Sequence, residues 1–294
     1  MISILISSFN TDVRRLVSDL SHQLNEINAL WEILIHDNGL QESFRSNMIE
    51  VFESQEHVRF FFNQTSSSRS ASRNWLARNS RFDFLLFIDA DAGIVDEKFI
   101  ARYLDSCTKD TVLVGGTAYR DSTPKREELL RWKYGKVREA VSAIDRNRSP
   151  WSSFSSFNFL VHKTWATKIP FDESIQEYGH EDTLLGMEFK NWCVPILHIE
   201  NPLYHDGLDN SDMFLEKSKT AVRTLKGLIN RGMIDEDVTL FKYYNYLKKL
   251  HLTPLIGLLF SMSRRLLEQQ ILSSSPNIYL FDLYRLLYLC SLKS

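Results

Sequence analysis

The sequence lacks a long uninterrupted run of hydrophobic residues. Its longest candidate in the C-terminal part, residues 255–260, is far shorter than the roughly 18 to 20 residues that a membrane-spanning helix needs. Cysteine is also scarce, because Cys107, Cys193 and Cys290 are the only three and lie far apart. This odd number and wide spacing fit neither a disulfide framework nor a cysteine metal cluster. Together with the absence of a basic leader before residues 2–7, these features predict a cytoplasmic protein without a transmembrane segment.

Neither sign of charge dominates the sequence. The 35 Lys and Arg residues nearly balance the 37 Asp and Glu residues, which gives a formal net charge of −2. Such a balance provides no long-range attraction to a phosphate backbone, so we expect no nucleic-acid partner. Hydrophobic residues make up 44% of the 294 positions, enough to bury a sizeable core, which excludes a wholly disordered chain.

Strand-like hydrophobic runs alternate with helix-like segments in the first part of the chain. The strand-like runs are residues 2–7, 32–36, 58–62, 84–88, 112–116 and 195–199, and helical spacing is found at residues 12–27, 41–54 and 70–79. This alternation predicts an α/β fold with an open, mostly parallel sheet covered by helices on both faces. In such folds, ligands bind beyond the carboxyl ends of the strands.

The later part of the sequence changes in character. Residues 125–147 are predicted to form one long charged helix, and from residue 240 onward the segments are helical and dense in Tyr, Leu, Lys and Arg. We therefore place a domain boundary near Asp237. The predicted domains are a larger one of residues 1–237 and a helical C-terminal extension of residues 238–294.

Two carboxylates, Asp89 and Asp91, directly follow the hydrophobic run 84–88. At a strand end both can reach one divalent cation, and hard cations such as Mn²⁺ and Mg²⁺ prefer oxygen ligands that they share with bound phosphates. One alternative is that the pair only forms a turn or caps the next element. Another is a phosphatase of the haloacid dehalogenase type, in which the first aspartate is a nucleophile. In such phosphatases the aspartate pair normally follows the first strand, whereas Asp89 and Asp91 follow the fourth predicted strand, which argues against this alternative.

A second acidic pair, Glu181 and Asp182, follows Gly179 and begins a segment with helical spacing. If a hydroxyl group of an acceptor molecule attacks in a direct displacement, a base must take its proton, and Asp182 is the candidate base. The alternative is that both acids only stabilise the N-terminus of a helix through its dipole, by a few tenths to about 1 kcal/mol.

His205 is a candidate third metal ligand, because a metal held by two carboxylates has room for a neutral imidazole. The alternative is a histidine that makes structural hydrogen bonds.

In their order along the chain, these residues resemble the family 2 glycosyltransferases of the GT-A fold, and specifically the bacterial members that build surface polysaccharides. The resemblance covers roughly residues 1–219. Its motifs are the N-terminal run through Ser7, Ser8, Phe9 and Asn10, then Asp37-Asn38-Gly39, Ser70-Ala71-Ser72-Arg73-Asn74-Trp75-Leu76-Ala77, Asp89-Ala90-Asp91, Phe171-Asp172-Glu173, Gly179-His180-Glu181-Asp182 and Asn201-Pro202-Leu203-Tyr204-His205.

The resemblance implies roles for particular residues. Phe9 would lie against the nucleotide base, Asn38 stands where the family usually has a second aspartate that contacts the base, and Arg73 would lie near the donor phosphates. The full implied set for the nucleotide is Ser7, Phe9, Asp37, Asn38, Arg73 and Asp89. The implied metal ligands are Asp89, Asp91 and His205. The implied catalytic residues are Asp182 as base and Glu181, which orients the acceptor or the donor sugar.

The activity that this resemblance implies is an inverting transfer that depends on Mn²⁺ or Mg²⁺. The donor would be a nucleotide-diphosphate sugar, with a UDP-sugar favoured, and the acceptor a hydroxyl of a glycan or lipid-linked glycan in polysaccharide or glycoconjugate synthesis. A non-catalytic nucleotide-sugar-binding subunit is the alternative, against which the intact Glu181 and Asp182 argue. A sugar nucleotidyltransferase ranks last, because no glycine-rich phosphate loop lies near the N-terminus.

Two further features leave alternatives open. Asn158 is a candidate for the acceptor side or, alternatively, a buried amide that satisfies backbone groups. Between Asp237 and Glu268 there is no acidic residue, while basic residues are interleaved with Tyr, Leu and Phe. Such a stretch predicts peripheral contact with the inner face of a membrane. The alternative is packing on the catalytic domain or on a second subunit of a homo-oligomer.

Overall fold

The computed structural model describes residues 1–27, 29–39, 41–62 and 68–292. The chain divides into two compact units. The first consists of Met1–Ala118, Val141–Ser174 and Leu185–Gly207, and the second of Tyr119–Ala140, Ile175–Leu184 and Leu208–Ser294. The boundary at Asp237 between a catalytic domain and an appended one stays a prediction.

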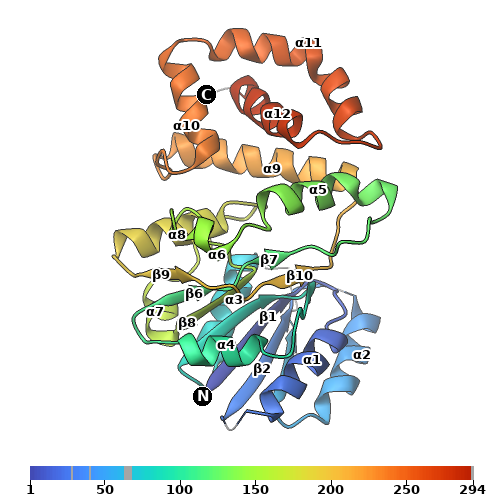
Figure 1. The fold of residues 1–294 in the computed structure, drawn as a ribbon, viewed down its shortest axis with the longest axis vertical. Coiled ribbons are helices and arrows are strands. Elements are labelled where there is room, and N and C mark those ends of the chain that lie inside the picture. The colour runs from blue at the N-terminus through green and yellow to red at the C-terminus, as the bar shows by residue number, and fades with distance from the viewer. Residues whose placement is uncertain (28, 40, 63–67, 293–294) are drawn as a thin grey trace. The chain divides into compact units, whose positions relative to one another are not determined.

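The first unit is built on a seven-stranded sheet in the order β3-β2-β1-β4-β8-β6-β9 (Figure 1). Its strands are β1 (Ile2–Ser8), β2 (Trp31–Asp37), β3 (Val58–Phe62), β4 (Phe84–Asp89), β6 (Val112–Val114), β8 (Asn158–His162) and β9 (Ile196–His198). All neighbours pair in parallel except β8, which runs antiparallel to both β4 and β6. The predicted α/β fold with a mostly parallel sheet is confirmed.

Hydrophobic side chains alternate between the two faces of this sheet and so create two cores. In β1, Ile4 and Ile6 belong to the core under α1 (Arg14–Asn25) and α4 (Phe99–Ser106), whereas Leu5 belongs to the core on the opposite face, which includes Leu76. A strand with both faces covered has no solvent-facing side, which explains the unbroken hydrophobic runs in the sequence. Helices lie on both faces of the sheet in Figure 1.

The other helices of the first unit are α2 (Glu42–Glu53), α3 (Arg69–Asn79), α6 (Ala143–Arg146) and α7 (Lys163–Lys168). Two of them, α2 and α3, agree with the sequence pattern to within one residue at each end, whereas α7 was not predicted. Helix α3 begins where the Ser68 hydroxyl accepts a hydrogen bond from the Ala71 amide, which satisfies one of the free N–H groups of the first turn. This cap fixes the start of the helix that carries Ser72, Arg73 and Asn74.

A second, three-stranded sheet of the first unit has the order β5-β10-β7. It consists of β5 (Ala92–Gly93), β7 (Thr117–Ala118) and β10 (Leu203–His205). The antiparallel register of β10 with β5 sets His205 opposite Ala92, the residue that follows Asp91. Two residues more than 100 positions apart in the chain therefore become neighbours.

The second unit is helical. Its elements are the 3₁₀ turn Arg126–Glu128, α5 (Leu129–Arg138), α9 (Ser211–Asn230), α10 (Thr239–Lys249), α11 (Thr253–Ile271) and α12 (Ile278–Ser291). Its core joins Leu130 of α5, Phe214 of α9, Phe260 of α11 and Phe281 of α12. The predicted helical character of the C-terminal region is confirmed. Within the described ranges, no helix is long and apolar enough to cross a membrane.

The prediction of one long helix over residues 125–147 is wrong. The chain forms the 3₁₀ turn, α5 and α6 as separate elements. At the end of α5 the Glu139 carboxylate accepts hydrogen bonds from the Tyr119 hydroxyl and from Arg131, whose Nη2 lies 3.0 Å away. A new helix then starts at Ser142, whose hydroxyl accepts from the Asp145 amide. Tertiary contacts and a cap thus override a continuous helical pattern.

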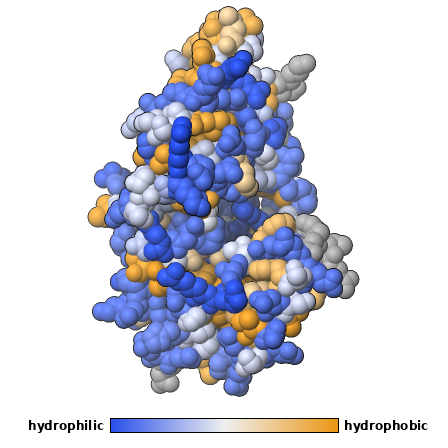
Figure 2. Space-filling model, turned by 90° about the vertical axis from the view of Figure 1, so that its right-hand side faces the viewer, coloured by the Kyte–Doolittle hydropathy of each residue, from blue (hydrophilic) through white to orange (hydrophobic). Residues whose placement is uncertain are grey.

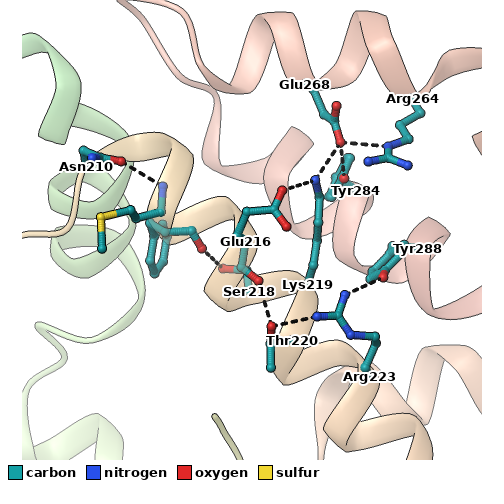
Figure 3. A network of polar contacts seen from close by, with 12 residues as sticks. Asn210, Glu216, Ser218, Lys219, Thr220, Arg223, Arg264, Glu268, Tyr284 and Tyr288 are labelled. Atoms are coloured by element: carbon teal, nitrogen blue, oxygen red, sulfur yellow. Dashed lines mark hydrogen bonds and ion pairs between the residues drawn. The ribbon is translucent and has the colours of Figure 1, made fainter. Parts of the chain in front are cut away.

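A polar network links three helices of the second unit (Figure 3). Glu268 of α11 accepts through Oε1 from Lys219 of α9 at 3.0 Å, from Arg264 of α11 at 2.9 Å and from the Tyr284 hydroxyl of α12 at 2.6 Å. Lys219 also pairs with Glu216, at 2.7 Å. Because the Lys219 side chain is only 7% exposed, these acids compensate a nearly buried charge.

Candidate functional site

The polar ends of three neighbouring strands lie together at one edge of the main sheet. In the parallel register, Ser7 of β1 is opposite Asp89 of β4, and Ser8 is opposite Asp37 of β2. The carboxyl ends of adjacent parallel strands are where α/β folds bind ligands. The structure therefore brings together the predicted strand-end residues Ser7, Asp37 and Asp89.

Asp37 fixes the backbone of two loops at this edge. It is fully buried, its Oδ1 accepts from the Asn10 amide at 2.8 Å, and its Oδ2 accepts from the Gly39 amide at 3.1 Å. Asn10 has a φ of 49°, in the left-handed region that Asn tolerates better than most residues. A Cβ at position 39 would lie 1.9 Å from Asn10 Oδ1, so only glycine fits there. The neighbouring Phe9 is 62% exposed.

Behind the strand ends, α3 contributes a buried polar contact to β1 and β2. The Ser72 hydroxyl lies 2.9 Å from the Ser7 hydroxyl and 2.8 Å from His36 Nδ1. The His36 ring also stacks on Trp75, with 4.5 Å between the ring centroids. These contacts hold Ser7 in place from the side of the helix.

Arg73 of α3 holds Asp89. Its Nη2 donates to Asp89 Oδ1 at 2.7 Å, and its guanidinium carbon lies 5.2 Å from the centre of the Phe171 ring. The residue is only 3% exposed, so the ion pair is shielded from water on the arginine side. Asn74 anchors the same segment by donating to the Phe171 carbonyl at 2.9 Å and to Glu173 Oε1 at 2.8 Å.

Asp91 and His205 meet next to this pair. His205 Nε2 lies 3.8 Å from Asp91 Oδ2, and the backbone amide of Asp206 donates to the Asp91 carbonyl at 3.0 Å. The His205 ring stacks on Phe157, with 5.3 Å between centroids and 13° between planes. The strand pairing of β10 with β5 and the stacking on Phe157 thus orient the imidazole toward the carboxylate.

The electrostatic state of Asp91 is consistent with a cation site. Burial raises the pKa of the Asp91 carboxyl, and although the nearby His205 acts to lower it, the negative charge of Asp89 adds to the increase. A divalent cation would offset both effects. Gly207 makes the close packing feasible, because a Cβ there would lie 2.3 Å from Asp91 Oδ2.

Two carboxylates and an imidazole are a donor set that suits Mn²⁺ or Mg²⁺, so the residues present fit such an ion. As the side chains stand in the described ranges, no three His, Cys, Asp or Glu residues are grouped closely enough to hold a metal ion. Asp91 and His205 are adjacent, whereas Asp89 is engaged by Arg73. The three-ligand site of Asp89, Asp91 and His205 stays a prediction.

Glu181 and Asp182 belong to the second unit, in the first turn of α8 (Glu181–Asn191). The chain enters the helix through Gly179, with a φ of 103°, and His180, with a φ of 70°. A Cβ at Gly179 would lie 2.7 Å from the Ala221 side chain, so this turn needs glycine for its conformation and for space. Glu181 is buried and Asp182 half-buried. Their catalytic roles stay predictions.

In the first unit, Asn158 takes one of its two predicted roles, and two further residues have roles that the sequence did not reveal. Asn158 is 1% exposed, donates to the Asn201 carbonyl at 2.9 Å and accepts from the Tyr103 hydroxyl at 2.6 Å, which confirms the alternative of a buried amide. Phe157 and Gly207 support the Asp91 and His205 pair but were not predicted. Phe157 lies in the aromatic segment beside Asn158 and Gly207 just beyond the His205 motif, yet neither spacing shows which side chain they contact.

Comparisons with known proteins agree with this architecture. The model of glycosyl transferase family 2 matches residues 3–169, more than half of the chain. The structure is similar to that of the mannosyltransferase PcManGT from Pyrobaculum calidifontis in complex with GDP-Man and Mn²⁺, with a TM-score of 0.54 and 10% sequence identity. That match covers 78% of this chain and 64% of the mannosyltransferase, so the chain spans less than two thirds of that protein.

A further similar structure is S. aureus TarS 1-349 in complex with UDP-GlcNAc. It has a TM-score of 0.47 and 16% sequence identity, and the match covers 74% of this chain and 64% of that one. No curated protein sequence matches the chain. From the family match and the arrangement of its central sheet, we conclude that this chain belongs to glycosyl transferase family 2 and has the GT-A fold.

Proposed function

We propose that this chain moves a sugar from a nucleotide-diphosphate sugar to an acceptor hydroxyl, with inversion at the anomeric carbon. The observation that carries the proposal is the strand-end cluster of Asp89, Asp91, Arg73 and His205 within a chain of family 2. A cluster of this kind suits a donor whose leaving group is a diphosphate, because the developing negative charge needs preorganised positive charge.

Asp91 and His205 would hold a divalent ion, Mn²⁺ or Mg²⁺, with Asp89 as the third ligand. When bound, the ion supplies the positive charge that stabilises the departing diphosphate. Arg73 orients the Asp89 carboxylate through its 2.7 Å contact, and we assign it a second role near the donor phosphates.

Phe9 and Asn38 would contact the nucleotide base. Both Asp37 oxygens accept backbone amide hydrogen bonds, so Asp37 acts by fixing the loops that present these two residues. Ser7, opposite Asp89 in the strand register, would complete the nucleotide site. We favour UDP as the nucleotide. GDP belongs in the same test because the similar mannosyltransferase is in complex with GDP-Man.

Asp182 would act as the base. In the proposed step the acceptor oxygen attacks the anomeric carbon while the bond from that carbon to the diphosphate oxygen breaks, and Asp182 accepts the hydroxyl proton. Glu181 orients the acceptor or the donor sugar. The acceptor would be a glycan or lipid-linked glycan used to build a bacterial surface polysaccharide or glycoconjugate at the inner face of the membrane.

The test is to incubate the full chain with UDP- and GDP-sugars, Mn²⁺ and glycan acceptors, and to measure release of nucleotide diphosphate and the anomeric configuration of the product. We expect Asp182→Asn to lower kcat by about 100-fold or more while nucleotide binding is retained. The matched control is Glu188→Gln, an exposed acid of the same helix, which should leave kcat unchanged. Nucleotide binding without release from any donor would instead support a non-catalytic sugar-nucleotide binder, and full activity of Asp182→Asn would remove Asp182 as the base.

A further inference from the structure

Helix α11 exposes a continuous apolar face. Leu255, Leu258, Leu259, Met262 and Leu266 are each between 51% and 75% exposed. Successive members lie one, three or four residues apart, which keeps all five on one side of a helix, and we call these five residues the α11 stripe. The opposite side contributes Phe260 and Ile271 to the core of the second unit. In Figure 2, hydrophobic side chains are exposed at the top of the view, where Figure 1 places α11.

The preceding helix α10 and its connection to α11 also expose aromatic and apolar side chains. Tyr243 and Tyr246 of α10 are 57% and 62% exposed, and Leu250 and Leu252 in the connection between the two helices are also exposed. Tyrosine combines an apolar ring with a polar hydroxyl and suits the boundary between hydrocarbon and water. The five exposed side chains that share one side of α11 indicate an interaction site rather than ordinary surface.

The charged side chains of α10 and α11 are mainly basic, and Glu236, which precedes α10, pairs with Lys249 at 3.4 Å. Lys242, Lys248 and Arg265 are exposed, and between Asp237 and Glu268 the sequence contains no acidic residue. The single acid of α11, Glu268, is used within the unit by Lys219, Arg264 and Tyr284 (Figure 3). The surface of α10 and α11 therefore combines apolar side chains with excess positive charge, which is complementary to a negatively charged partner.

We propose that the α11 stripe, together with the exposed basic residues Lys242, Lys248 and Arg265 of α10 and α11, docks on the surface of a lipid bilayer that contains anionic lipids. Leucine and methionine enter the boundary of the acyl chains, and the basic side chains bind lipid headgroups. A second copy of the chain is a poorer occupant, because it would bring two basic surfaces together while Glu268, the one acid of α11, is already engaged by Lys219, Arg264 and Tyr284. The docking needs neither nucleotide nor metal, so it can be tested independently of the proposed transfer reaction.

The test is co-sedimentation of the full chain, without nucleotide or metal, with vesicles of phosphatidylcholine and phosphatidylglycerol and with vesicles of phosphatidylcholine alone. We expect binding to the anionic vesicles that weakens with added salt. The double variant Leu258→Gln, Met262→Gln should bind about tenfold or more weakly, because it removes two of the five inserted side chains. Lys248→Gln should reduce binding about fivefold.

The matched control is Ile144→Gln, which changes a 77% exposed hydrophobic residue of α6 in the first unit and should leave vesicle binding unchanged. All these positions are exposed, so thermal unfolding of each variant should match that of the parent, which separates lost docking from lost folding. The proposal is overturned if the parent does not sediment with anionic vesicles, if it binds phosphatidylcholine equally well, or if the stripe variant binds as the parent does. Light scattering that shows a dimer dissolved by the stripe variant, with vesicle binding unchanged, would assign the surface to a second copy instead.

Discussion

Replacing Glu268 by Gln tests how much the polar network of Figure 3 contributes to the stability of the second unit. The variant keeps the size of the side chain and removes its charge. Among the described residues, it leaves Lys219, whose side chain is 7% exposed, with Glu216 as its one remaining acidic partner. Removing one partner of a nearly buried ion pair is costly because the remaining charge is poorly solvated.

The expected size of the effect follows from the pKa of Glu268. Burial acts to raise this pKa, but hydrogen bonds from Tyr284, Arg264 and Lys219 outweigh burial and lower it from 4.5 to about 2. A difference of this size corresponds to about 3 kcal/mol of stabilisation. Because the Glu268 side chain is 23% exposed and that of Arg264 51% exposed, water screens part of the interaction. We therefore expect Glu268→Gln to lower the free energy of unfolding by about 2 kcal/mol at neutral pH.

The lowered pKa of Glu268 also predicts how the effect of Glu268→Gln on stability changes with pH. A carboxyl whose pKa is lower in the folded state stabilises the fold fully above its ordinary pKa of 4.5, and this contribution is lost as the pH falls through about 2. Glutamine does not titrate. The difference in unfolding free energy between the parent and the variant should therefore shrink as the pH falls below 4.5.

The assay is urea denaturation followed by circular dichroism, at neutral pH and at about pH 3. Glu216→Gln is the matched control, because Glu216 pairs with the same Lys219 but its side chain is 67% exposed. For this control we expect a loss below about 0.5 kcal/mol. Equal losses for the two variants, or a difference for Glu268→Gln that does not shrink in acid, would refute the reasoning.

Three other variants test local features of the structure. Gly207→Ala would place a Cβ 2.3 Å from Asp91 Oδ2, so calorimetry should show about tenfold weaker Mn²⁺ binding with little change in melting temperature. Asp37→Asn cannot accept both backbone hydrogen bonds, from Asn10 and Gly39, so thermal unfolding should show a loss of about 1 to 2 kcal/mol. Burial lowers the pKa of His180 from 6.5 to about 4, so the neutral ring stabilises the fold above pH 6.5 and this contribution is lost as the pH falls toward 4. His180→Asn should remove that part of the acid dependence of stability, and an unchanged dependence would contradict the role of burial.

Strands and their order along the chain could be predicted because their signal is local. The runs at residues 2–7 and 84–88 are hydrophobic without interruption, as strands covered on both faces must be, and they correspond to β1 and β4. The predicted strand at residues 58–62 has the bounds of β3. The polar residues that follow such runs were therefore correctly placed at one edge of the sheet.

The parts that could not be predicted depend on contacts between distant residues. The break in the segment 125–147 follows from Glu139, which turns back to Tyr119 and Arg131. The proximity of His205 to Asp91 depends on pairing between two very short strands, β5 and β10, which no local pattern distinguishes from loops. The contact of Asp37 with the loop after β1 likewise depends on the Asn10 amide, which lies 27 positions earlier in the chain.

The most direct test of the proposed site is Mn²⁺ binding in the presence of UDP or GDP, measured by calorimetry on the parent chain and on Asp91→Asn. Asp91 is the carboxylate that lies next to His205, at 3.8 Å, and the variant preserves its shape while removing its charge. We expect Mn²⁺ and nucleotide to bind together to the parent, and the variant to bind Mn²⁺ at least about tenfold more weakly. Equal Mn²⁺ affinity of the parent and Asp91→Asn would contradict a metal site at this edge of the sheet.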